Sequence, residues 1–301
     1  MSNIKKDITV TVGIPAYNEE RNIGILLQNL ISQELSAPFK LERIFVVASG
    51  CRDNTRQIVE TLKKKYNVID LIWEDERTGK ASALNRIFKR AKTDILVLMG
   101  ADVIPRKGSL IRLIHPFIEV SVGAVSGHPI PINVPNRLAD TAACLIWDLH
   151  DLFSRELDVK LTGEFFAIRK ELIDKIYLKV NCDDALIEFL IKKINYKIKY
   201  APNAVVDIKG PENFQDFLMQ RRRIHAGHLQ IKQITGKSVK TASIRENILV
   251  LVKIFRKYYK NKWFVPAILM EIWARIQGYL DFLKKNYHII WKRVNSTKNL
   301  R

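Results

Sequence analysis

Three short stretches of this 301-residue sequence carry side chains that could do chemistry. In DILVLMGADVIP, the carboxylate of Asp102 follows five apolar residues, and a buried strand rarely ends on a lone acid without a partner. In CDDALIEFL, Asp183 and Asp184 open a helical pattern, and in QRRRIHAGH three consecutive arginines lie inside another. Carboxylates transfer protons or bind cations, and guanidinium groups grip anionic oxygen atoms.

Two of these stretches also have a plain structural explanation. Acidic residues at a helix start complement the helix dipole, which alone would account for the acidic pair. An isolated run of arginines is usually a solvated basic face of a helix. Choosing between the chemical and the structural explanation requires the secondary-structure elements around the three stretches and their order along the chain.

The first hundred residues alternate strand and helix patterns. ITVTVGIPAY is rich in β-branched residues, and the following NEERNIGILLQNLISQ has apolar residues at the spacing of one helical face. The alternation repeats in LERIFVVASG with DNTRQIVETLKKKY, and in VIDLIWE with GKASALNRIFKRAK. This predicts an α/β fold with a mostly parallel sheet flanked by helices, whose ligands bind beyond the carboxyl ends of the strands. Asp102 lies at such an end.

Composition narrows the class of protein. With 47% apolar residues, the chain can bury one large core, with or without an appendage. The formal charge of +19 calls for an anionic partner: nucleic acid, a phosphorylated substrate or an acidic membrane surface. Three widely spaced cysteines without a CxxC motif favour a reducing compartment, and MSNIKKDITV lacks the apolar core of a signal peptide. We therefore expect a cytoplasmic protein.

Six motifs in register resemble the family 2 glycosyltransferases of the GT-A fold, a Rossmann-like architecture, over roughly residues 8 to 235. VGIPAYNEERNI resembles the opening strand and nucleotide loop of that family, and VVASGCRDNT its VVDDGSTDGT element. Four further stretches of this chain resemble family motifs: GKASALN resembles GKAxALN, and MGADVIP resembles DADTIP. DDALI resembles EDxxL, and QRRRI resembles QxxRW. The resemblance implies inverting transfer of a sugar from a nucleotide-diphosphate sugar to an acceptor hydroxyl.

The resemblance also implies a role for each matched residue. Asp102 corresponds to the last Asp of the DxD motif, which binds Mg²⁺ or Mn²⁺, cations that take oxygen ligands. Asp184 corresponds to the catalytic base and Asp183 to the acid before it, while Gln220 and Arg223 match the motif that grips the diphosphate. The implied donor-binding positions are Pro15, Ala16, Tyr17, Glu19, Ser49, Lys80, Ala101 and Asp102. The implied acceptor-side positions are Thr162, Gly163 and Glu164, which Trp147 and His150 could extend, although aromatic residues at helical spacing more often belong to a core.

The sequence departs from the family pattern at three positions. Gly100 replaces the first Asp of DxD and removes one possible metal ligand. Ser49 replaces the acid that commonly reads the nucleotide base, so the donor base stays open. Ile224 replaces the Trp of QxxRW, where processive synthases stack the growing chain, and this favours transfer of a single sugar. Arg221 and Arg222 are expected to be surface charges.

The sequence changes character after about residue 238. From residue 241 onward, thirteen Lys and Arg residues stand against three Asp and Glu residues, mixed with aromatic and aliphatic ones. Charges interrupt the apolar runs before they reach the roughly 20 residues of a spanning helix. We predict a catalytic domain over residues 1–238 and a C-terminal amphipathic helical extension over residues 239–301. The extension would bind an anionic membrane surface, pack on the catalytic domain or form a homodimer.

The resemblance and the extension together favour a lipid-linked or glycan acceptor and a peripheral location at the inner face of the cell membrane. Two alternatives come from other classes. A nucleic-acid-binding protein would explain the charge and the arginine run, but no recognised binding module is present, and we expect no nucleic acid partner. A nucleotidyltransferase would also place a metal-binding acid near a strand end, but it usually has a glycine-rich loop after its first strand, which GIPAYNEE lacks.

Overall fold

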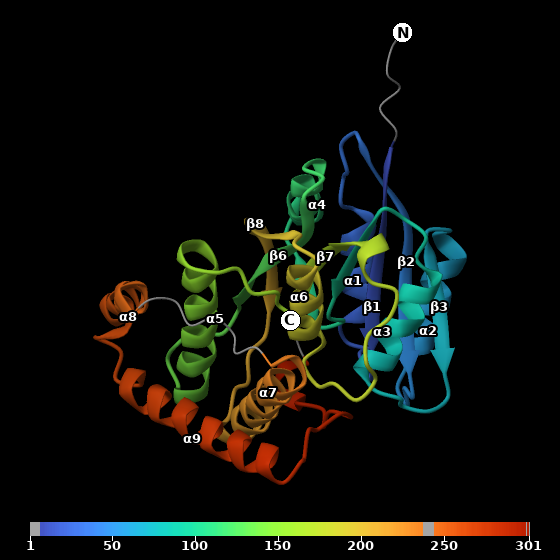
Figure 1. Cartoon of the computed structure of the whole chain (residues 1–301). Helices are drawn as coiled ribbons and strands as arrows, with labels where there is room; N and C mark the ends of the chain where they lie inside the picture. The colour runs from blue at the N-terminus through green and yellow to red at the C-terminus, as the bar shows by residue number, and fades with distance from the viewer. Residues whose placement is uncertain (1–6, 237–243, 299, 301) are drawn as a thin grey trace.

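The structure is a computed structural model that describes residues 7–236, 244–298 and 300. Figure 1 shows a sheet flanked by helices. The strands are β1 (Ile8–Ala16), β2 (Phe39–Ser49), β3 (Ile69–Glu74), β4 (Ile95–Met99), β5 (Val103–Pro105), β6 (Val122–Pro131), β7 (Phe165–Arg169) and β8 (Lys197–Ile208). Within the described residues they form one eight-stranded sheet in the order β3-β2-β1-β4-β7-β6-β8-β5.

The amino-terminal half consists of repeated strand and helix units, as the sequence predicts. The strands β3, β2, β1 and β4 are parallel neighbours. The helices α1 (Ile23–Ile31) and α2 (Thr55–Lys65) pack on one face of the sheet, and α3 (Lys80–Arg90) packs on the other. Alternate residues of β4 serve the two faces, because Val97 belongs to the first core and Leu98 to the second. The carboxyl ends of these four strands therefore meet at one edge.

The second half of the sheet has mixed strand directions. β7 runs antiparallel to both β4 and β6, and β5 runs antiparallel to β8, while β6 and β8 are parallel. The helices of this half are α4 (Ser109–Ile114), α5 (Leu138–Glu156), α6 (Asp183–Lys193) and α7 (Phe214–Thr235), with short 3₁₀ turns η1 (His115–Ile118) and η2 (Lys170–Leu172). Parallel pairing therefore predominates in the sheet, as the sequence predicts, although only the amino-terminal half is purely parallel.

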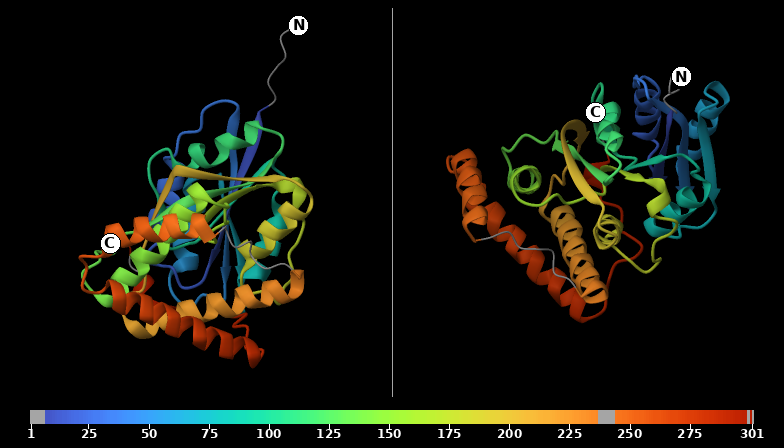
Figure 2. Two further views of the ribbon diagram at one scale, coloured as in Figure 1. Left: turned by 60° about the vertical axis from the view of Figure 1, so that its left-hand side comes forward. Right: turned by 45° about the horizontal axis from the view of Figure 1, so that its top comes forward.

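Two further helices lie outside the layers formed by the sheet and the helices that flank it. Figure 2 shows α8 (Ile244–Tyr258) and α9 (Phe264–Leu283) along α5 and α7, on the side away from β1, β2 and β3. An apolar cluster joins α5, α7, α8 and α9. Gly278 lets α9 approach α7 closely, since a Cβ there would lie 2.5 Å from the carbonyl oxygen of Arg222.

Ion pairs also hold α9 to α7. Arg221 forms a two-pronged pair with Glu271, and Arg222 forms one with Asp281. The expectation that these two arginines are surface charges is therefore wrong, because each is paired with an acid on α9, 50 and 59 positions away in the sequence.

None of the described helices is long and apolar enough to cross a membrane. The division of the chain at residue 238 stays a prediction, and that boundary lies outside the described residues. After α9 the chain turns back, and it carries the 3₁₀ turn η3 (Asn295–Thr297) near its end.

Candidate active site

One large cavity, of about 1080 Å³, lies at the carboxyl ends of the parallel strands. Its walls come from the loops after β1, β3 and β4, the residues before β7, the start of α6, the face of α7 and residues 291–298. Every site residue named from the sequence lines it, namely Pro15, Ala16, Tyr17, Glu19, Ser49, Lys80, Ala101, Asp102, Thr162, Gly163, Glu164, Asp183, Asp184, Gln220 and Arg223. The fold thus brings together positions spread over more than 200 residues, while their individual roles stay predictions.

Two carboxylates face one point next to Gly100. A Cβ on that glycine would lie 2.9 Å from Oδ1 of Asp102 and 3.2 Å from Oε2 of Glu164. The Glu164 carboxylate therefore uses the space that a side chain at residue 100 would enter. Burial, followed by the negative charge of Asp102, raises the pKa of Glu164 to about 7.

This donor set fits a divalent cation that is shared with a bound diphosphate. No group of three or more His, Cys, Asp or Glu side chains is placed to hold a metal ion among the residues that the structure describes. Mg²⁺, however, is commonly held by one or two protein carboxylates together with substrate phosphates and water. Asp102 and Glu164 supply that number of acids.

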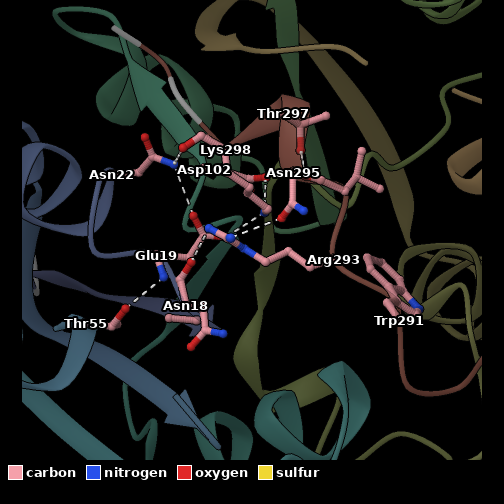
Figure 3. Close-up of polar contacts among 12 residues, drawn as sticks. Asn18, Glu19, Asn22, Thr55, Asp102, Trp291, Arg293, Asn295, Thr297 and Lys298 are labelled. Carbon is pink, nitrogen blue, oxygen red and sulfur yellow. Dashed lines mark hydrogen bonds and ion pairs between the residues drawn. The ribbon is translucent and has the colours of Figure 1, made fainter. Parts of the chain in front are cut away.

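The carboxylate of Asp102 is paired with an ammonium group from the far end of the chain. Nζ of Lys298 lies 2.5 Å from Oδ2 of Asp102 and 2.6 Å from Oε1 of Glu19, as Figure 3 shows. Although burial opposes it, the charge of Lys298 holds the pKa of Asp102 below its usual value. Burial and the charge of Asp102 raise the pKa of Glu19 to about 6. The site attracts a cation, and in this structure the cation is a lysine.

The acidic pair at the start of α6 divides into a buried and a more open carboxylate. Oδ2 of Asp183 lies 3.1 Å from Nζ of Lys80, and its side chain is only 3% exposed. Asp184 is less buried, and its carboxylate accepts hydrogen bonds from the backbone N–H groups of Gly163 and Ala185, each at 2.9 Å. Burial raises the pKa of Asp183. Both acids do lie in the first turn of α6, but their partners across the cavity go beyond helix capping.

The arginine run also divides. Arg223 is 6% exposed, and its Nε has no hydrogen-bond partner within the described part of the chain. Its guanidinium lies 3.8 Å from the ring centre of Trp291, a stacked cation–π arrangement. Burial lowers the pKa of Arg223 to about 10, so the group stays charged near neutral pH. An indole is therefore present beside this arginine although Ile224 stands where the family motif has Trp.

The nucleotide-side wall is built by loops that hold one another. Ser49 donates a hydrogen bond to the carbonyl of Glu76 and accepts one from the N–H of Thr78, so it fixes the loop after β3. That loop presents Arg77, whose guanidinium lies 3.6 Å from the ring centre of Tyr17. The aromatic face and the guanidinium together form a flat, positively charged surface.

On the opposite side, the cavity wall is more apolar. Trp147 and His150 both line the cavity, and their rings lie 5.6 Å apart. Trp147 also packs against the sheet core, so it belongs to both environments that the sequence left open. Burial, reinforced by Lys160 and His128, lowers the pKa of His150 to about 4, and its Nε2 finds no hydrogen-bond partner among the described residues.

Sequence reasoning did not assign several charged and aromatic side chains that line the cavity, among them Arg77, Trp291, Arg293 and Lys298. The last three belong to WKRVNSTK, which follows the amphipathic pattern of α9. The signal that could have drawn attention is the loss of helical periodicity there, combined with one Trp among basic residues.

The parallel strand-and-helix half, the mixed second half and a cavity at the strand ends that contains acidic and basic side chains define a GT-A fold. The sequence profile described as "Glycosyl transferase family 2" matches residues 11–177. The chain therefore belongs to the family 2 glycosyltransferases.

Two curated relatives and one solved structure are similar to the chain. It is 27% identical over 239 residues to "Probable glycosyltransferase YdaM" of Bacillus subtilis, covering 75% of this chain and 56% of that protein. It is 25% identical over 268 residues to "Poly-beta-1,6-N-acetyl-D-glucosamine synthase" of Staphylococcus aureus, covering 84% and 64%. The chain thus spans about three fifths of the length of these relatives.

The solved structure is the mannosyltransferase PcManGT from Pyrobaculum calidifontis in complex with GDP-Man and Mn²⁺. It superposes with a TM-score of 0.67 at 19% identity, and the match covers 93% of this chain and 88% of that one. This likeness supports the fold. None of these three similarities points to nucleotidyl transfer or nucleic acid binding.

Proposed function

We propose that this protein transfers a single sugar from a nucleotide-diphosphate sugar to an acceptor hydroxyl, with inversion at the anomeric carbon and with the help of a divalent cation. The observation that carries the proposal is the buried guanidinium of Arg223, whose Nε has no acceptor within the described residues. A buried charge without a hydrogen-bonding partner is costly, and a diphosphate oxygen would satisfy it.

Each cavity group has a part in this reaction. Asp184 would take the proton of the acceptor hydroxyl while the acceptor oxygen attacks the anomeric carbon. The bond from that carbon to the diphosphate breaks on the opposite side, which leaves the bonding electrons on the phosphate oxygen. The N–H groups of Gly163 and Ala185 orient the Asp184 carboxylate for this task. Arg223, supported by Gln220, would grip the diphosphate.

Asp102, with Glu164 beside it, would hold Mg²⁺ or Mn²⁺. Such a cation neutralises the negative charge that develops on the leaving diphosphate. The Mn²⁺ in the PcManGT complex supports this part of the proposal. Tyr17, Arg77 and Ser49 would form the surface for the base and ribose, and the base itself is open.

Calorimetry with a panel of nucleoside-diphosphate sugars, with Mn²⁺ or with EDTA, tests donor and cation together. We expect at least one donor to bind, and its affinity to fall when EDTA replaces Mn²⁺. The Asp102→Asn variant should lose that metal effect and keep its fold. Asp174→Asn is the matched control, because the Asp174 side chain is 93% exposed and lies outside the cavity lining. If Mn²⁺ still raises donor affinity in Asp102→Asn, Asp102 is not a ligand of the cation.

Inversion is tested separately, by NMR determination of the anomeric configuration of the product.

Single transfer, rather than polymerisation, is supported by the contents of the cavity. Ile224 leaves no aromatic side chain at its own position. Product analysis by mass spectrometry should show addition of one sugar per acceptor.

A membrane-proximal, lipid-linked acceptor is supported by the outer faces of α8 and α9, which we call the apolar surface. Its exposed side chains are Leu249, Leu251, Val252, Phe255, Tyr259, Val265, Ile268, Leu269, Ile272, Trp273, Ile276, Tyr279, Leu280 and Leu283. Apolar side chains of this kind insert at a headgroup boundary, while nearby Lys and Arg contribute attraction to anionic lipid of about 1 kcal/mol each. We therefore propose that the protein is peripherally bound at the inner face of the cell membrane. The competing outcome is that the apolar surface forms a homodimer interface.

Vesicle flotation at low and high salt tests this location. The full chain should float with anionic vesicles at low salt and less at high salt, because salt screens the attraction. The double variant Leu269→Glu with Ile276→Glu should lose flotation. Val120→Glu, which changes another exposed apolar residue away from α9, is the control. If the double variant floats as well as the control, the apolar surface does not bind membranes, and a change in its oligomeric state would identify a dimer interface.

A further inference from the structure

The chain after α9 crosses the cavity as a distinct piece, which we call the C-terminal segment (residues 286–298). Its backbone is held at both ends of the crossing. Arg77 donates a hydrogen bond of 2.5 Å to the carbonyl of Trp291, and Asn22 donates one of 3.3 Å to the carbonyl of Lys298. Between them, Arg293 donates to the carbonyl of Asn18 at 2.8 Å, as Figure 3 shows.

A further contact ties the C-terminal segment to the start of α7. The hydroxyl of Ser296 donates to Oδ2 of Asp216 at 2.5 Å. Val294 and Thr297 are each 5% exposed. The C-terminal segment is therefore docked by specific contacts and not merely draped over the opening.

Two of its side chains occupy the positions where the proposed reaction needs ligands. The Lys298 ammonium lies between Asp102 and Glu19, with its side chain 17% exposed. The Trp291 indole covers the Arg223 guanidinium, the group proposed to hold the diphosphate. A cation at Asp102 and the Lys298 ammonium cannot share one place, because two positive charges at that separation repel strongly in a poorly hydrated cavity.

We propose that the C-terminal segment is a built-in competitor of the donor and its cation, with Lys298 in the place of the cation and Trp291 on the diphosphate-binding arginine. The inference rests on the proposed function. The structure is then the closed, resting form, and the donor with its cation binds when the C-terminal segment withdraws. The observed affinity is the intrinsic affinity multiplied by the fraction of molecules in which the segment is withdrawn.

The competing idea is that Lys298 belongs to the working site and supplies the positive charge itself. The two ideas predict opposite changes in ligand affinity when the charge of Lys298 is removed. A competitor weakens binding of Mn²⁺ and of a nucleoside diphosphate, so removing its charge strengthens both. A working lysine strengthens binding of the nucleoside diphosphate, so removing its charge weakens it.

The first experiment measures binding of Mn²⁺, and of UDP and GDP with Mn²⁺, to the full chain by calorimetry. Lys298→Met should bind Mn²⁺ and the nucleoside diphosphate at least about tenfold more tightly than the wild-type chain, which corresponds to a segment withdrawn in less than about a tenth of wild-type molecules. Lys284→Met is the matched control: it makes the same change of charge at an exposed residue just before the C-terminal segment and outside the cavity lining, and its affinities should stay at the wild-type value. Unchanged or weaker binding by Lys298→Met would overturn the proposal.

The second experiment separates withdrawal from a purely electrostatic effect. Amide hydrogen exchange of residues 291–298 should become at least about tenfold faster in the wild-type chain when Mn²⁺ and the tighter-binding of UDP and GDP are added. Slower or unchanged exchange would mean that the segment closes over the ligand or stays in place, and would overturn the competitor. If neither UDP nor GDP nor any nucleoside-diphosphate sugar of the donor panel binds to any of the three proteins, the proposed function fails as well, which is a result distinct from binding without competition.

Discussion

The ion pair between Lys80 and Asp183 allows a sharp test of what joins the two halves of the fold. Lys80 begins α3 in the amino-terminal half, and Asp183 begins α6 in the second half. Nζ and Oδ2 are 3.1 Å apart, with the two side chains 20% and 3% exposed. Although burial works against it, Asp183, Asp184 and Glu164 together raise the pKa of Lys80. Replacing Lys80 by Met leaves these acids without their shared cation.

Removing one partner of a buried pair typically costs 3–5 kcal/mol of unfolding free energy. Because Lys80 is one-fifth exposed, we expect the lower end, about 3 kcal/mol at pH 8. Asp183 and Glu164 already have raised pKa values, about 7 for Glu164, and loss of the lysine raises both further. A carboxyl whose pKa is higher in the folded state than in the unfolded state destabilises the fold increasingly as the pH rises from the unfolded pKa to the folded pKa, and has no effect below both. The cost of Lys80→Met should therefore shrink at pH 5.5.

Urea unfolding of the wild-type chain, Lys80→Met, Asp183→Asn and the double variant gives the coupling energy directly. We expect about 2 kcal/mol at pH 8, because the double variant leaves no unpaired charge at this contact. Lys89→Met, an exposed change on the same helix, should be close to neutral. A coupling energy below about 0.5 kcal/mol, or a larger loss at pH 5.5 than at pH 8, would refute the reasoning.

Two further predictions concern single residues of the cavity. Asp184→Asn should lower turnover by roughly a hundredfold or more with donor affinity nearly unchanged, whereas Asp183→Asn should lower turnover less, and steady-state kinetics with the order reversed would exchange their roles. His150, with its pKa lowered by burial to about 4, stays neutral in the fold and takes up a proton on unfolding below pH 6.5, so stability should fall by roughly 1–2 kcal/mol between pH 7.5 and pH 5. In His150→Phe the acid-dependent loss in urea unfolding curves should be smaller by this amount, and His228, whose pKa burial also lowers to about 4, accounts for a loss that remains. An identical loss in both proteins would show that His150 does not contribute.

The parallel half of the fold could be predicted because its signals are local. A largely apolar strand is followed by a helix with one apolar face, as Ile8–Ala16 and Ile23–Ile31 illustrate. The direction of β7 could not be predicted in this way. Phe165–Arg169 is equally apolar, but its antiparallel pairing with β4 depends on the route of the chain through β6 and α5, which no local pattern records.

The residues of the candidate site also fall into those that local sequence patterns could predict and those that they could not. The residues at the carboxyl ends of parallel strands could be brought together from the strand pattern alone, since those ends meet at one edge. The contact of Lys298 with Asp102 spans 196 positions in the sequence, and Lys298 follows an irregular polar stretch with no periodicity. Its position is determined by docking of the C-terminal segment, for which the sequence carries no repeating pattern.

The three consecutive arginines show why a charge run needs its partners before it can be interpreted. Successive residues of a helix point about 100° apart, so three in a row cannot share one face. Arg223 turns into the cavity, while Arg221 and Arg222 reach Glu271 and Asp281 on α9. What looks like a uniform basic patch in the sequence is one candidate ligand for an anion and two attachments for a helix. The same α9 presents the apolar surface outward and leads into the C-terminal segment, so these two pairs hold in register the elements on which both proposals rest.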